Sequence, residues 1–133
     1  MSIHALYPPM NTLRPSALST HSTYLDLSRK IRNAEEPDNA GLIHQFLALK
    51  PPSNQCSKSI YRTHLHMQFQ LLLDTVADEY LPPHWRGQCL NHIYRPLYSL
   101  QRIVDCENSK QQVRSLRHEL RIISHYFQAR LSS

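Results

Sequence analysis

Residues 58–81, KSIYRTHLHMQFQLLLDTVADEYL, decide the fold of this chain. Apolar side chains recur here at steps of 4, 4, 3, 4 and 4, which is the spacing of one face of an α-helix. Leu73 widens this face, so we expect the helix to lie centrally in the core. Ser57 or Ser59 is a suitable N-cap, and the prolines at 82–83 end the segment. The predicted core face consists of Tyr61, Leu65, Phe69, Leu72, Val76 and Tyr80.

Two shorter helices are predicted before this segment, because apolar residues again recur at helical spacing. Ser22 or Thr23 would cap the first, which ends near Pro37. The second begins at the Asp and Asn of residues 38–39 and stops at Pro51. Their apolar positions are Tyr24, Leu27, Ile31 and Ala34 in the first, and Leu42, Ile43, Phe46, Leu47 and Leu49 in the second.

Two longer helices are predicted after it, at about 84–105 and 109–131. Pro96 lies inside the first, where it removes one backbone hydrogen bond and is expected to kink the helix one turn earlier. Asn108 or Ser109 would cap the second. The expected buried positions are Cys89, Ile93, Leu97, Leu100 and Val104 in one helix, and Val113, Leu116, Leu120, Ile123 and Phe127 in the other.

The predicted fold class is therefore all-α: a small antiparallel helical bundle of three long helices plus one or two short ones. Short connections between the last three helices favour antiparallel neighbours. Residues 1–20 hold three prolines among Ser, Thr and Asn, with no apolar period, which predicts an extended or disordered N-terminal arm. We expect residues 21–133 to form a single helical domain.

The composition excludes several classes of function. Two glycines among 133 residues cannot supply a phosphate-cradling nucleotide loop. Three widely spaced cysteines with no CxxC pair, no apparent secretory leader and no long apolar run predict a cytoplasmic protein without disulfides or membrane contact. The histidines and cysteines show no clustered metal-binding motif, so we expect no metal or other cofactor.

The excess positive charge is concentrated in the last fifty residues. Residues 1–83 hold seven Lys/Arg and seven Asp/Glu, whereas residues 84–133 hold eight and three, which accounts for the net charge of +5. If the apolar stripe of 109–131 faces the core, four cations lie together on its outer side; we call Lys110, Arg114, Arg117 and Arg121 the basic rail. Arg95 and Arg102, seven residues apart, would extend the rail if they face the same way.

Three interpretations of these six cations compete. They are a solvated surface, a binding site for an acidic protein partner, or a contact with nucleic-acid phosphates. Arginine, which makes up eleven of the fifteen Lys/Arg residues, suits bidentate recognition of carboxylates. No helix-turn-helix, zinc-finger or RNA-binding signature favours nucleic acid. We therefore predict a non-enzymatic regulatory or adaptor protein that binds an acidic partner, with a nucleic-acid-binding accessory factor as the alternative.

Two further features leave alternatives open. Residues 1–20 are similar in composition to the uncleaved N-terminal signals of proteins handled by specialised bacterial secretion machines, which implies a secretion-system chaperone, effector or component as a further alternative. Trp85, the one tryptophan, is expected to plug an end of the core, although it would also suit an interface. Neither the cysteines nor the scarce carboxylates suggest a catalytic site.

Overall fold

The computed structural model describes residues 15–51 and 57–132, and within these ranges the chain is helical with no strand. The all-α prediction is confirmed for this part of the chain. In none of its helices is a stretch both long enough and apolar enough to cross a membrane. The helices are α2 (Pro15–Arg32), α3 (Gly41–Ala48), α4 (Lys58–Ala77), α5 (Pro83–His92), α6 (Tyr94–Arg102) and α7 (Glu107–Ser132).

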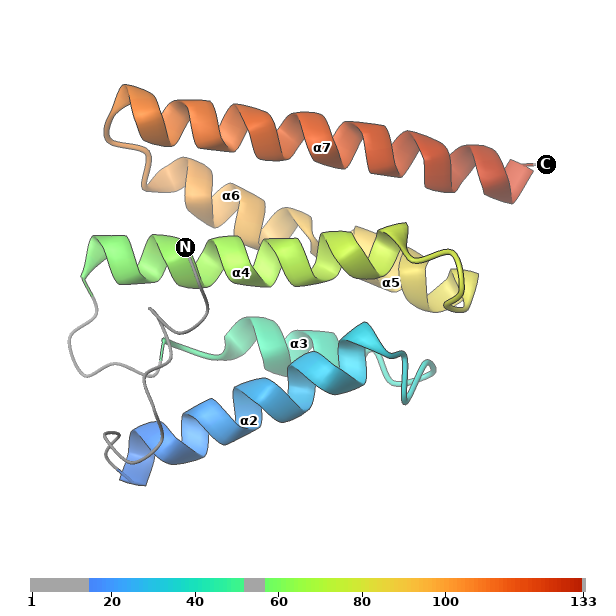
Figure 1. Cartoon of the computed structure of the whole chain (residues 1–133), viewed down its shortest axis with the longest axis horizontal. Coiled ribbons are helices and arrows are strands. Elements are labelled where there is room, and N and C mark those ends of the chain that lie inside the picture. Colours follow the sequence, from blue (N-terminus) through green and yellow to red (C-terminus); the bar gives the residue numbers. More distant parts are fainter. Residues whose placement is uncertain (1–14, 52–56, 133) are drawn as a thin grey trace.

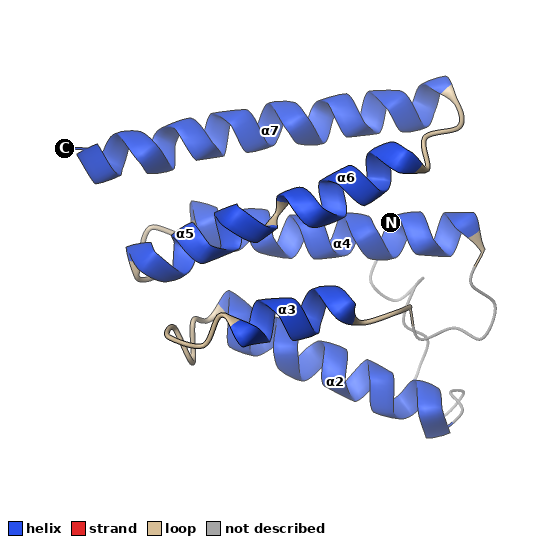
Figure 2. Cartoon of the chain, turned by 180° about the vertical axis from the view of Figure 1, so that it is seen from behind, coloured by secondary structure: helices blue, strands red, loops and turns tan. Residues whose placement is uncertain are grey.

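Successive helices run in alternating directions, with α5 and α6 together forming one return path (Figure 1). Helices α2 and α3 lie on one side of α4, and α7 lies on the other (Figure 1). Seen from behind, α5 and α6 lie across α4, between α3 and α7 (Figure 2). Helix α4 is thus central, as its wide apolar face predicted. Fully buried side chains come from nearly every layer, including Ile31, Ile43, Phe46, Phe69, Leu72, Trp85 and Ile93.

The central helix α4 begins where the sequence indicates but ends earlier. The hydroxyl of Ser57 accepts the backbone N–H of Ile60 at 3.1 Å, which confirms it as the N-cap. The helix stops at Ala77, so the expected extension to residue 81 is wrong. Tyr80 is consequently 99% exposed, and Tyr61, near the start, is 36% exposed instead of packed in the core. The four predicted positions between them, Leu65, Phe69, Leu72 and Val76, are buried.

Helix α2 begins at Pro15, earlier than the predicted caps at Ser22 or Thr23. Its first turns therefore occupy residues 15–20, which the sequence assigned to the arm, while residues 1–14 of that arm lie outside the described residues. Proline is well suited to a first helical position because its missing N–H has no partner to lose there. The secretion-signal interpretation depends mainly on the residues that are not described.

The C-terminal end of α2 is closed by a Schellman motif with an unusual residue. Glu35 N–H bonds Lys30 C=O at 3.0 Å and Ala34 N–H bonds Ile31 C=O at 3.2 Å. This geometry places Ala34 at φ 51°, a left-handed conformation that normally favours glycine.

Side chains from α4 hold the end of α3. Gln68, which is buried, donates from Nε2 to the carbonyl of Phe46 at 2.9 Å, and Nε2 of His64 lies 2.9 Å from the carbonyl of Leu49. The carbonyl of Phe46 also accepts the backbone N–H of Leu49 at 3.2 Å, so Gln68 supplies a second bond to a carbonyl in the last turn of the helix. The start of α3 differs from the prediction, because its N-cap is Ala40 with no side-chain bond.

The segment predicted as one kinked helix over 84–105 is two helices. Helix α5 ends at His92 and α6 begins at Tyr94, so the break falls one turn before Pro96, where the kink was expected. Pro96 has no N–H to donate to the carbonyl four residues earlier, and it occupies the third position of α6, where that loss is harmless. Ile93 at the junction is fully buried, which fixes the joint against the core.

Trp85 is a packing residue. Its side chain is fully buried, and its indole N–H donates to the carbonyl of Ile31 at 2.9 Å, which ties α5 to the last turn of α2. The neighbouring Arg86 donates from Nε to the carbonyl of Val76 at 2.7 Å, and its guanidinium lies 4.8 Å from the ring centroid of Phe127 on α7. The beginning of α5 therefore contacts three other helices.

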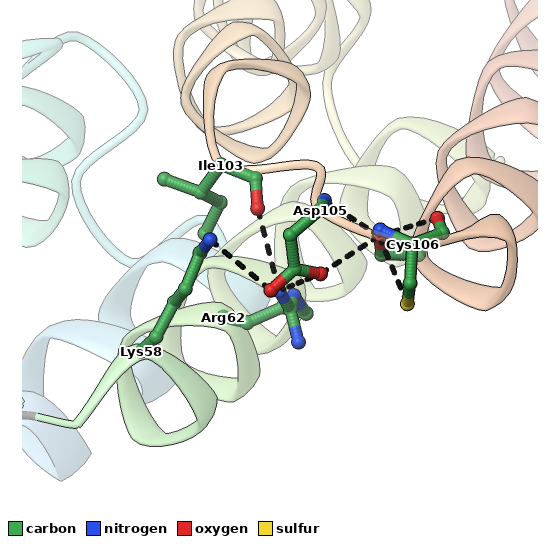
Figure 3. A network of polar contacts seen from close by, with 6 residues as sticks. Lys58, Arg62, Ile103, Asp105 and Cys106 are labelled. Atoms are coloured by element: carbon green, nitrogen blue, oxygen red, sulfur yellow. Dashed lines mark hydrogen bonds and ion pairs between the residues drawn. The ribbon is translucent and has the colours of Figure 1, made fainter.

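Helix α7 begins at Glu107, so neither Asn108 nor Ser109 is its N-cap. Ser109 instead occupies the third helical position, and its hydroxyl accepts the backbone N–H groups of Asp105 and Cys106, both at 3.2 Å (Figure 3). These bonds fold the turn between α6 and α7 back onto the first turn of the helix.

Candidate interaction groove between α6 and α7

The basic rail lies along the exposed side of α7. Val113, Leu116, Leu120 and Phe127 are buried, so the helix presents Lys110, Arg114, Arg117 and Arg121 to solvent. Ile123, expected in the core, is half-buried. Helix α6 runs antiparallel to α7 directly beside it (Figures 1 and 2). The rail therefore faces the open seam between these two helices.

A hollow of about 490 Å³ occupies the part of this seam nearer the C-terminus of α7. Arg117 and Arg121 form one wall, and Tyr94 and Tyr98 of α6 form the other. The two tyrosines are 38% and 56% exposed, and their ring centroids are 6.2 Å apart. The remaining lining residues are Leu97, Leu120, Ser124, His125 and Gln128.

A second hollow of about 320 Å³ continues the seam toward the start of α7. Lys110, Arg114 and Arg117 line its α7 side, and Gln101 and Val104 line the other. Arg117 borders both hollows, so they adjoin along the seam; we call the two together the α6–α7 groove. All four members of the basic rail line it.

The charged residues that line the groove are all positive. Among the described residues, no Asp or Glu lines either hollow, and Lys110, Arg117 and Arg121 form no ion pair. Arg114 has one acidic neighbour, Glu107, at 3.6 Å, and both side chains are more than 60% exposed, so this pair neutralises little.

The acid in the middle of α7, Glu119, does not line the groove. Burial lowers the pKa of His66 on α4, and the nearby Glu119 opposes that shift. Glu119 is therefore close enough to α4 to act on His66, and it is absent from the lining of both hollows. The rail keeps its positive potential because the helix presents its own acid to a different neighbour.

Several cations elsewhere in the molecule are paired with acids. Arg32 on α2 pairs with Asp78 at 2.8 Å, and Arg29 contacts Asp26 at 2.8 Å. At the other end of α4, Lys58 reaches Asp105 at 3.1 Å. The excess charge of the sequence is thus left mainly on the α6–α7 side.

Asp105 also fixes the position of the groove. It lies in the turn that joins α6 to α7, and Lys58 and Arg62 of α4 both contact its carboxylate at 3.1 Å (Figure 3). Arg62 donates in addition to the carbonyl of Ile103 in the same turn at 3.3 Å. The hydrogen bond from Lys58 is the largest of the effects that hold the pKa of Asp105 below its usual range. The turn is clamped to α4, so the start of α7 has a defined place.

Arg95 and Arg102 do not line the groove. The guanidinium of Arg95 lies 3.3 Å from Nδ1 of His44 on α3, and Nε2 of His44 lies 3.1 Å from Nε2 of His92. Arg102 is exposed but borders neither hollow. The structure therefore brings together four of the six predicted cations and adds the tyrosine wall. Neither Tyr94 nor Tyr98 was among the predicted site residues. The spacing of Tyr94 and Tyr98, four apart on one helical face, was the available signal.

The histidines, cysteines and acids of the described residues form no cluster suited to a metal ion. Within residues 15–51 and 57–132, no three His, Cys, Asp or Glu side chains come close enough to hold a metal ion. Cys89 is fully buried, and burial raises the pKa of its thiol to about 12, which keeps it protonated and unreactive at neutral pH. Cys56 lies outside the described residues. Comparison with known proteins found no matching family model, no matching curated protein and no matching solved structure.

Proposed function

We propose that this protein is a non-enzymatic adaptor or regulator that binds an acidic region of a protein partner in the α6–α7 groove. The single observation that carries the proposal is the groove itself: three arginines and a lysine along one wall, tyrosines on the other, and no acid among its described lining residues. A merely solvated surface needs no hollow and no exposed tyrosine pair.

The residue types in the groove favour recognition over loose attraction. Arginine presents a planar fork that bonds carboxylates bidentately, and charge-assisted bonds of this kind are the stronger ones. Tyrosine and arginine are also enriched among the residues that dominate binding energy at protein interfaces. The groove combines both, since Arg117 and Arg121 lie opposite Tyr94 and Tyr98.

The test is a pull-down from native cell extract with a charge-reversed variant and a matched control. Arg117→Glu/Arg121→Glu changes two groove residues, whereas Arg29→Glu/Lys50→Glu makes the same charge change on exposed residues of the α2–α3 side. We expect the wild type and the control to capture the same protein, and the groove variant to lose at least tenfold in affinity. Equal capture by both variants would refute the proposal. Circular dichroism checks that both variants are folded.

A second candidate is a nucleic-acid-binding accessory factor, and one observation favours it. The exposed rings of Tyr94 and Tyr98, beside arginines, resemble the combination on which single-stranded bases stack while phosphates meet cations. Nuclease treatment of half the extract separates the two candidates. Capture that survives nuclease supports a protein partner, and capture that collapses, with affinity falling steeply as salt rises, supports nucleic acid.

A further inference from the structure

The dimensions of the α6–α7 groove limit what can lie in it. Its α7 wall extends from Lys110 to Gln128, eighteen residue steps along one helix. At 1.5 Å per residue this is about 27 Å, which an extended chain of about eight residues would span at about 3.3 Å each.

The floor of the groove argues against a helical occupant. Leu97, Leu120 and Val113 are only 3%, 4% and 9% exposed, because they already belong to the buried core. A helix that docks into a groove needs an open apolar trough for its i, i+3 and i+4 anchors. What remains accessible here is the pair of walls, not an apolar floor.

The two walls differ in chemistry, and an extended chain is suited to that difference. Successive side chains of an extended segment point to opposite sides, so one set can face α7 while the other faces α6. Arg114, Arg117 and Arg121 call for carboxylates on one set, and Tyr94 and Tyr98 call for aromatic or apolar side chains on the other.

The spacing of the rail agrees with this arrangement. From Lys110, the cations at 114, 117 and 121 lie about 6, 10 and 16 Å along the helix axis. Carboxylates on alternate residues of an extended chain repeat every 6.6 Å or so, within reach of these long and flexible side chains. Three or four such carboxylates could each meet a cation.

Building on the proposed function, we infer that the occupant of the groove is an extended segment of a partner in which acidic residues alternate with aromatic or apolar residues. The acids face the basic rail, and the intervening side chains pack against Tyr94 and Tyr98 in one hollow and against Gln101 and Val104 in the other. The order of the residues in the partner, and not its net charge alone, then determines affinity.

Two synthetic octapeptides of identical composition test this inference. One alternates Glu and Tyr, and the other has four Glu followed by four Tyr; both carry a fluorophore for anisotropy titrations at 150 mM salt. We expect the alternating peptide to bind at least tenfold more tightly than the block peptide. We also expect Tyr94→Ser/Tyr98→Ser, which changes exposed side chains, to remove most of that preference.

The possible results separate this inference from the proposed function. Equal affinity for both peptides, lost in Arg117→Glu/Arg121→Glu, would overturn the alternating pattern while supporting an acidic partner. No measurable binding of either peptide would overturn both. Tighter binding of an oligothymidylate of eight nucleotides than of the alternating peptide, with a steep salt dependence, would also overturn both and place phosphates on the rail.

Discussion

Replacing Trp85 by phenylalanine tests whether the tie between α5 and α2 stabilises the fold as its geometry indicates. Two contributions are lost in this variant. The indole N–H no longer donates to the carbonyl of Ile31, a bond of 2.9 Å, and the part of the indole that phenylalanine lacks leaves a space in a site with no solvent exposure. Both losses weaken the contact between α5 and the last turn of α2.

The magnitude follows from the surroundings of that carbonyl. Ile31 C=O also accepts the N–H of Ala34 at 3.2 Å, so it keeps one partner, and the lost bond should cost a net 0.5–1.5 kcal/mol, roughly. Complete truncation of a buried tryptophan costs about 3–5 kcal/mol, and phenylalanine retains more than half of the ring, so the space adds roughly 1–2 kcal/mol. We expect Trp85→Phe to lower the free energy of unfolding by about 1.5–3.5 kcal/mol.

Urea unfolding followed by circular dichroism at 222 nm measures this change, because the variant removes the one tryptophan and with it the fluorescence signal. The midpoint should fall with the slope unchanged, as a loss of stability without a change in the cooperative unit requires. Tyr80→Phe, on a side chain that is 99% exposed, is the control and should stay within about 0.5 kcal/mol of wild type. A loss below that same limit for Trp85→Phe would show that the indole neither fills the site nor holds α2.

Three further predictions concern single positions. Burial lowers the pKa of His64 in the folded state, so near and below the ordinary pKa of about 6.5 the unfolded state binds more protons than the folded state. The free energy of unfolding therefore falls as the pH drops through that range. His64→Gln should weaken this dependence in unfolding curves recorded from pH 7 to 5. Ala34→Gly should raise the free energy of unfolding by up to about 1 kcal/mol, since glycine tolerates φ 51° and alanine does not; a clear loss in thermal denaturation would contradict the Schellman geometry. Cys89→Ala should leave the number of rapidly reacting thiols in the native protein unchanged in a dithionitrobenzoate assay, because that thiol is buried and protonated; a decrease by one would contradict its burial.

Helix positions could be predicted from the sequence because they depend on local spacing. The steps of three and four in 58–81 correctly identified the buried side of α4, and the serine before it correctly identified the cap. Errors arose where the outcome depended on neighbours. Tyr61 and Tyr80 continue the pattern, but Tyr61 remains exposed and Tyr80 lies beyond the last helical residue, so spacing alone could not show that neither reaches the core.

The basic rail could be predicted for the same reason, and the groove could not. Exposure of Arg117 and Arg121 follows from the buried stripe of their own helix. Whether Tyr94, Tyr98 or Arg95 faces them depends on the rotation of α6 after the break at residue 93, which one sequence does not specify. That break turns both tyrosines toward α7 and leaves Arg95 beside His44 on α3.

The placement of the acids explains why the groove keeps its charge. Eight of the ten Asp/Glu residues lie outside α7, and several of these bind cations that hold layers together, as Asp78 does for Arg32 and Asp105 does for Lys58. The Lys58–Asp105 pair is exposed, and exposed pairs contribute little stability each. The acid at the centre of α7, Glu119, is near His66 on α4 and does not line the groove. The charged residues that line the groove from Lys110 to Arg121 are all cations, and among them only Arg114 is partly paired, with Glu107. Arg32 and Lys58 are thus paired with acids, whereas three of the four cations along the groove have no acidic partner among the described residues. These three cations suit the groove to bind an acidic molecule.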